Sequence, residues 1–83
     1  MSQSINQKKV YSTENLALAT AISLWFPPES IDKTNPRKVR FEFLQSKHLD
    51  ELVESFWKHE VRVEPLEFFN TLKALKSRIY GEG

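Results

Sequence analysis

Hydrophobic and polar residues alternate most clearly in segment 38–44, where Val39, Phe41 and Phe43 are separated by charged residues. This period of two predicts a half-buried β-strand with one apolar face and one charged face. Such a strand needs a neighbour, and segment 29–32 is the nearest candidate across a turn-forming sequence. The pattern therefore predicts a two-stranded antiparallel hairpin.

Helical periodicity predicts a first helix over about 13–25, because Ser12 and Thr13 are good N-cap residues and two prolines follow at 27 and 28. This segment carries no charged side chain between Asn15 and Pro28. Such a helix is either packed on all sides within its own domain or packed against another chain.

Three apolar residues of this helix are candidates for a protein interface. Leu16 and Leu24 lie away from the face that Leu18 and Ile22 share on a helical projection. Trp25, at the end of the helix, has the size and chemistry of an interface anchor, although it also suits a core.

Two further helices are expected after the hairpin. Ser46 suits the N-cap of a second helix that ends near His59 or Glu60, and Pro65 suits the first position of a third helix ending near Tyr80. The expected fold class is α+β, in the order α-β-β-α-α, with the two C-terminal helices on the apolar face of the hairpin.

The chain has 83 residues, of which 40% are hydrophobic and 28% charged, so we expect one small domain over 10–83 after a flexible tail at 1–9. Cysteine is absent, which excludes disulfides and thiolate chemistry. The longest apolar stretch, 16–26, is too short to span a bilayer. We therefore expect a soluble, cytoplasmic protein without a membrane partner.

Catalysis, metal binding and cofactor binding are not expected. Glycine occurs only at 81 and 83, so no glycine-rich phosphate loop exists. On a helix His48 and His59 would be about 16 Å apart, too far to share a metal ion. The acidic residues are spread along one predicted helix face, and no serine lies in a nucleophile motif.

The charges are arranged in blocks, although the net charge is only +1. Two basic segments, 33–40 and 73–78, contain no acidic residue and flank an acidic stretch. The cations of the first segment are Lys33, Arg37, Lys38 and Arg40. They fit phosphate contacts, but charges on the polar face of an exposed strand are also ordinary.

The third helix has a second face on which aromatic and basic residues interleave. Phe69, Lys73, Lys76 and Tyr80 fall within about a quarter of the helical wheel. Aromatic rings with nearby cations suit base stacking and phosphate contact. Alternatively, the two rings flank the core and the lysines are simply solvated.

Two hypotheses for the function follow. The first is a small non-enzymatic protein that binds DNA or RNA through the two basic segments and the aromatic residues of the third helix. The second is a protein-interaction module, most simply a homodimer, that uses the uncharged first helix.

Four segments together carry a resemblance to a known family: Tyr11–Leu16, Val39–Phe43, Val63–Phe69 and Leu72–Tyr80. They resemble a small domain family of unknown function found in bacterial and phage-type genomes, over about residues 10–80. The resemblance implies a shared fold, because most matching positions are expected core or cap residues. It implies no catalytic residues, and it leads us to expect Asp before Pro65, where this chain has Glu64.

Overall fold

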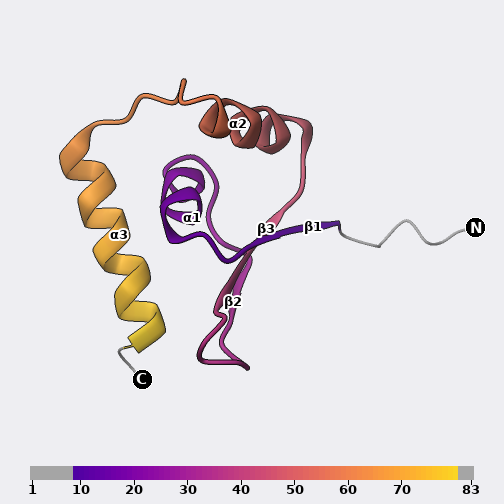
Figure 1. Cartoon of the computed structure of the whole chain (residues 1–83), viewed down its shortest axis with the longest axis vertical. Helices are drawn as coiled ribbons and strands as arrows, with labels where there is room; N and C mark the ends of the chain where they lie inside the picture. The colour runs from indigo at the N-terminus through magenta and orange to yellow at the C-terminus, as the bar shows by residue number, and fades with distance from the viewer. Residues whose placement is uncertain (1–8, 81–83) are drawn as a thin grey trace, which may run out of the picture.

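The computed structural model describes residues 9–80. In chain order these residues form β1 (Val10–Thr13), α1 (Leu16–Ser23), β2 (Ser30–Asp32), β3 (Arg40–Leu44), α2 (Lys47–Trp57) and α3 (Pro65–Tyr80) (Figure 1). The α+β class is confirmed, with three helices and a three-stranded antiparallel sheet in the described residues. The expected order α-β-β-α-α lacks the first strand.

The strand β1 corrects the predicted start of the first helix. Tyr11 pairs with Phe43 and Thr13 pairs with Phe41 in an antiparallel ladder. Valine, tyrosine and threonine favour strands once a partner is available, and β3 provides that partner. The helix therefore begins three residues later than predicted, capped by Asn15, whose Oδ1 accepts from the Leu18 amide at 2.9 Å.

The predicted hairpin is present and consists of β2 and β3. The strand β3 is also the central strand of the sheet. β2 pairs with β3 with Ile31 opposite Phe41, and the strand order is β1-β3-β2. Phe41 and Phe43 are buried while Arg40 is exposed, which confirms the alternation read from the sequence. The pairing begins at Arg40 rather than Lys38, and the sheet has three strands rather than two.

The helix α1 lies at the centre of the molecule, between the sheet, α2 and α3 (Figure 1). All five residues from Leu18 to Ile22 are buried, and Ala19 and Ile22 are fully enclosed. The buried hydroxyl of Thr20 donates to the Leu16 carbonyl at 2.8 Å, so burial leaves it hydrogen-bonded. Packing within the domain therefore explains why this helix has no charged side chain.

The helix α1 ends at Ser23, two residues before its predicted end. Leu24 is its C-cap, and the amides of Trp25 and Phe26 both donate to the Ile22 carbonyl, at 2.9 and 2.8 Å. These contacts turn the chain before Pro27, which cannot continue a helix.

The two C-terminal helices begin where the sequence predicts. Ser46 caps α2, its hydroxyl accepting from the Leu49 amide at 3.1 Å. Glu64 caps α3, its carboxylate accepting from the Glu67 amide at 2.7 Å, so glutamate fills the role for which aspartate was expected. Leu75 of α3 is buried against the core.

Residues 1–8 of the predicted tail and residues 81–83 of the predicted domain lie outside the described residues. Lys9, the last residue of that tail, is described, and its carbonyl accepts from the Gln45 amide at 2.9 Å. No helix within residues 9–80 combines the length and apolar character needed to cross a bilayer.

The tight enclosure of α1 can be tested with one added side chain. Ala19→Leu adds three carbon atoms to a side chain that is completely buried. We expect this overpacking to lower the free energy of unfolding by about 1–3 kcal/mol. Ala17→Leu makes the same change at an exposed position of the same helix and should stay within about 0.5 kcal/mol of the wild type. Urea unfolding followed by circular dichroism measures both. Equal stabilities for the two variants would contradict the central position of α1.

Candidate nucleic-acid interface

The basic turn between β2 and β3 has a fixed shape, set by side chains that hydrogen-bond to nearby backbone. Asn35 Oδ1 accepts from the Arg37 amide at 3.0 Å, and the Asn35 carbonyl accepts from the Lys38 amide at 2.9 Å. Asp32 Oδ1 accepts from the Thr34 amide at 2.9 Å. Asparagine and aspartate favour such turns because their short side chains imitate a backbone turn.

Two of the four cations in this segment are engaged within the chain. Arg40 forms an ion pair with Asp32 at 3.5 Å. The amide and hydroxyl of Thr34, and then Arg40, lower the pKa of Asp32 below its ordinary value, so this carboxylate stays ionised beside Arg40 at neutral pH. Lys33 Nζ donates to the Arg78 carbonyl in the last turn of α3 at 2.9 Å.

The other two cations, Arg37 and Lys38, are exposed, and their side chains have no hydrogen-bond or ion-pair partner within residues 9–80. A partner-free guanidinium and a partner-free ammonium are available to an anion without breaking a contact of the fold. These two residues are therefore the strongest phosphate-contacting candidates of segment 33–40.

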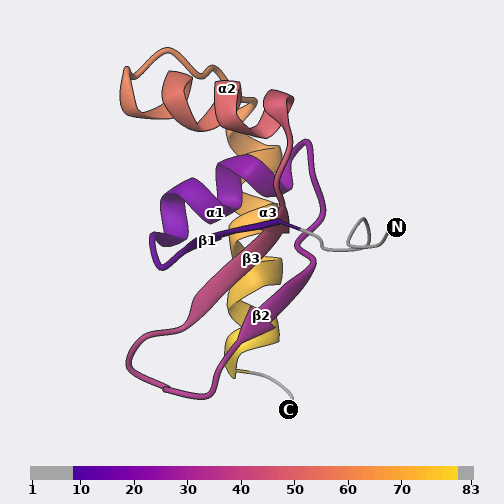
Figure 2. The ribbon, with the colours of Figure 1, turned by 90° about the vertical axis from the view of Figure 1, so that its right-hand side faces the viewer.

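The fold brings the basic turn to the C-terminal end of α3. Arg37, Lys38 and Tyr80 line one hollow of about 210 Å³. The turn and the end of α3 lie at the same end of the molecule in both views, opposite α2 (Figure 2). The two predicted basic segments are thus neighbours in space, joined by the Lys33–Arg78 contact.

The predicted aromatic and basic face of α3 is exposed. Tyr80 is 78% exposed and Phe69 is 53% exposed, so neither ring is a flanking core residue. Lys73 Nζ lies 5.3 Å from the centre of the Phe69 ring, a cation–π contact. Lys73, Lys76 and Tyr80 line a second, shallow hollow.

Tyr80 belongs to both hollows and so makes the two regions continuous. We use the term basic aromatic surface for this region. Its members are Arg37, Lys38, Phe69, Lys73, Lys76 and Tyr80. Six of the eight residues predicted to bind nucleic acid lie on this surface, while Lys33 and Arg40 stand beside it in contacts with the chain itself.

The three predicted interface residues of the first helix do not form one exposed patch. Leu16 is half-buried and packs against the core, and Leu24 is half-buried at the helix end. Trp25 is 53% exposed. Of the three, only Trp25 offers a largely accessible side chain.

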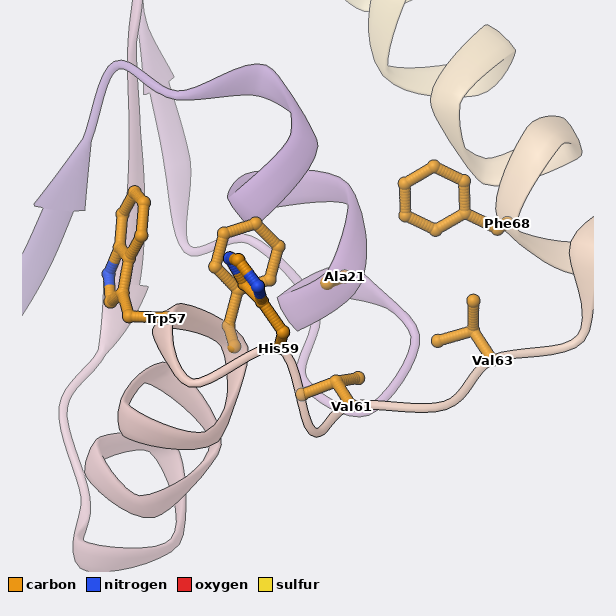
Figure 3. A pocket seen from close by; sticks show the side chains of 7 residues that line it. Ala21, Trp57, His59, Val61, Val63 and Phe68 are labelled. Carbon is orange, nitrogen blue, oxygen red and sulfur yellow. The ribbon is translucent and has the colours of Figure 1, made fainter.

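A third hollow, which is apolar and has a volume of about 350 Å³, lies between the end of α2 and the start of α3 (Figure 3). Its lining comes from Ala21 of α1, Phe56 and Trp57 of α2, the following link, and Phe68. Val63 and Phe68, which the sequence places at the positions of a hydrophobic staple, both line it. Sequence reasoning did not predict this hollow, although the staple spacing and the alternating valines at 61 and 63 were local signals for it.

His59, the one polar side chain in this apolar lining, occupies an unusual backbone position. Its φ is 63°, the left-handed region that favours glycine. Its amide donates to the Phe56 carbonyl at 3.0 Å and the next amide, of Glu60, donates to the Ser55 carbonyl at 2.9 Å. This pair of bonds is the Schellman motif, which ends α2 at Trp57.

The titratable residues in the described part of the chain do not gather into a metal site. No three His, Asp or Glu residues within 9–80 are grouped so that they could hold a metal ion. His59 lies among apolar side chains, without a carboxylate or hydroxyl in the lining of its hollow.

These observations define a small α+β domain with a basic and aromatic surface that extends from the turn between β2 and β3 along α3. The model of a family described as a domain of unknown function, DUF5659, matches residues 8–81, and the chain belongs to this family. The resemblance to a small domain family of unknown function is thereby confirmed. No curated protein and no solved structure matches the chain.

The left-handed position of His59 leads to a stability prediction. His59→Gly removes the steric cost of a Cβ at positive φ, and we expect it to raise the free energy of unfolding by about 0.5–1 kcal/mol. His48→Gly is the matched control, because this exposed position lies inside α2, where glycine should cost about 1 kcal/mol. Thermal unfolding compares the two, and a lower melting temperature for His59→Gly would contradict the cap assignment.

Proposed function

We propose that this protein is a small non-enzymatic domain that binds nucleic acid through the basic aromatic surface. The observation that carries the proposal is the meeting of two acid-free basic segments, 33–40 and 73–78, around the exposed ring of Tyr80. Cations supply sequence-independent attraction to phosphates, and exposed rings supply stacking surfaces for bases.

The contacts within the chain support separate roles for the cations. Arg37, Lys38 and Lys76 have no partner within residues 9–80, so their charges are available to phosphates. Lys33 and Arg40 are held by Arg78 and Asp32, and they fix the turn against α3 and β2. In this proposal the three partner-free cations bind the nucleic acid, whereas Lys33 and Arg40 hold the turn in position.

The two aromatic residues of α3 are spaced so that both could contact one strand of nucleic acid. Phe69 and Tyr80 are eleven residues apart, which is about three helical turns, so they share a face about 16 Å apart along the axis. Lys73 and Lys76 lie between them in sequence on the same face. A nucleic acid lying along α3 would therefore meet a ring, two ammonium groups and a second ring in succession.

Charge reversal on α3 tests the proposal. Lys73→Glu with Lys76→Glu should weaken binding of labelled DNA or RNA at least about tenfold and lower the salt slope for a single strand by about 1.4, the value for two lost phosphate contacts. Both lysines are exposed, so the domain should remain folded. Fluorescence anisotropy at two salt concentrations measures both quantities.

A control with the same change in charge separates local contacts from net charge. Lys9→Glu with Lys47→Glu makes the same substitutions on two exposed residues just before β1 and at the start of α2, outside the basic aromatic surface. It should reduce affinity far less than the double change on α3. Equal losses in the two double variants, or no binding by the wild type at low salt, would overturn the proposal.

A further inference from the structure

The hollow shared by the basic turn and the end of α3 combines four kinds of chemistry. Half-buried aliphatic side chains, among them Val39 and Ile79, form part of its lining, and the ring of Tyr80 adds an aromatic surface. Arg37 and Lys38 add cations. Phosphate binding alone needs only the cations, whereas the apolar and aromatic part of the lining can also receive a flat apolar part of a ligand.

The fourth kind of chemistry is a carboxylate, that of Glu14, in the segment between β1 and α1. Glu14 is exposed, lines the same hollow, and has no hydrogen-bond or ion-pair partner within residues 9–80. An ionised carboxylate accepts hydrogen bonds and cannot donate them. Its negative charge, next to the cations of this hollow, disfavours the binding of a phosphate. A ligand that also carries a hydrogen-bond donor for this carboxylate would offset that repulsion.

A nucleotide carries all the complementary groups in one molecule. Its base is flat and apolar on its faces, its phosphate is anionic, and cytosine, adenine and guanine bear an amino group that donates hydrogen bonds. Thymine and uracil have no amino group, and their one N–H donor, at N3, lies between two carbonyl oxygens that a carboxylate repels. Glu14 therefore has the chemistry to select an amino-bearing base.

The dimensions favour an unpaired base. A volume of about 210 Å³ is small, and Tyr80 is one of its lining residues. A base within a duplex has both faces stacked and its pairing edge occupied, so it cannot offer a face to Tyr80 and its amino group to a carboxylate at the same time. The lining thus fits a base from a single strand.

Building on the proposed function, we infer that this hollow seats one unpaired base of a nucleic acid strand. The base stacks on Tyr80, its phosphate contacts Arg37 and Lys38, and Glu14 accepts a hydrogen bond from the amino group of cytosine, adenine or guanine. The protein therefore prefers single strands over duplexes and amino-bearing bases over thymine or uracil.

The experiment compares fluorescently labelled dC12, dT12 and a dA12·dT12 duplex by anisotropy at one low salt concentration. The wild type should bind dC12 about tenfold more tightly than dT12, the discrimination expected for one charge-assisted hydrogen bond to a base. Cytosine and thymine have rings of the same size, so stacking differences do not dominate the comparison.

Two variants assign the preference to residues. Glu14→Gln should bring the dC12 to dT12 affinity ratio close to one, because an amide both donates and accepts. Glu51→Gln removes the same charge from an exposed position on α2 and should leave the ratio unchanged. Tyr80→Leu should weaken dC12 binding about tenfold through lost stacking and leave the duplex nearly unaffected.

The readouts distinguish this inference from the proposed function. Equal affinity for dC12 and dT12, with binding that still falls steeply with salt, would overturn the base-selecting hollow and leave the phosphate-binding surface intact. Displacement of dC12 by micromolar cytidine monophosphate would contradict a nucleic acid strand as the ligand and indicate a free nucleotide instead. Absence of binding to every strand and to the duplex would overturn both.

Discussion

The burial of α1 is the constraint on which the rest of this structure depends. A short helix without charged side chains is stable in water only if neighbours cover it, and the sheet, α2 and α3 do so from different sides. Alanines at 19 and 21 are buried among larger side chains, so the surrounding elements approach the helix closely. The placement of α3, and with it the candidate site, follows from this packing.

The helix α3 serves the core and the surface with different faces. Leu75 is buried and Ile79 packs against the core, whereas Phe69 and Tyr80 are exposed. Because the core fixes the rotation of α3 about its axis, it also fixes the direction in which the aromatic and basic face points. Lys33 adds a second constraint, since its bond to the Arg78 carbonyl places a cation at the negative end of the helix dipole.

Local patterns predicted the features that depend on near neighbours in sequence. The alternation in β3, the Ser46 cap and the proline at the start of α3 all follow from short-range stereochemistry, and all are present. The strand β1 was missed because Val10–Thr13 is a strand only through its pairing with β3, about thirty residues away. Sequence patterns predicted that most of the site residues are exposed, but not that the two basic segments are neighbours. Their proximity depends on contacts such as that between Lys33 and Arg78, which are 45 positions apart.

The distribution of charge reconciles a net charge of +1 with the proposed binding of an anionic ligand. Acidic residues of α2, such as Glu51 and Glu54, are exposed at one end of the molecule, whereas the basic turn and the last turns of α3 lie at the other end. Charges at that separation are largely screened from each other at physiological salt. Under the proposed function, a phosphate chain would be attracted to the end that carries the basic turn and repelled from the acidic face of α2, which would orient its approach toward Tyr80. On this argument the blocks of charge in the sequence matter more for binding than their sum.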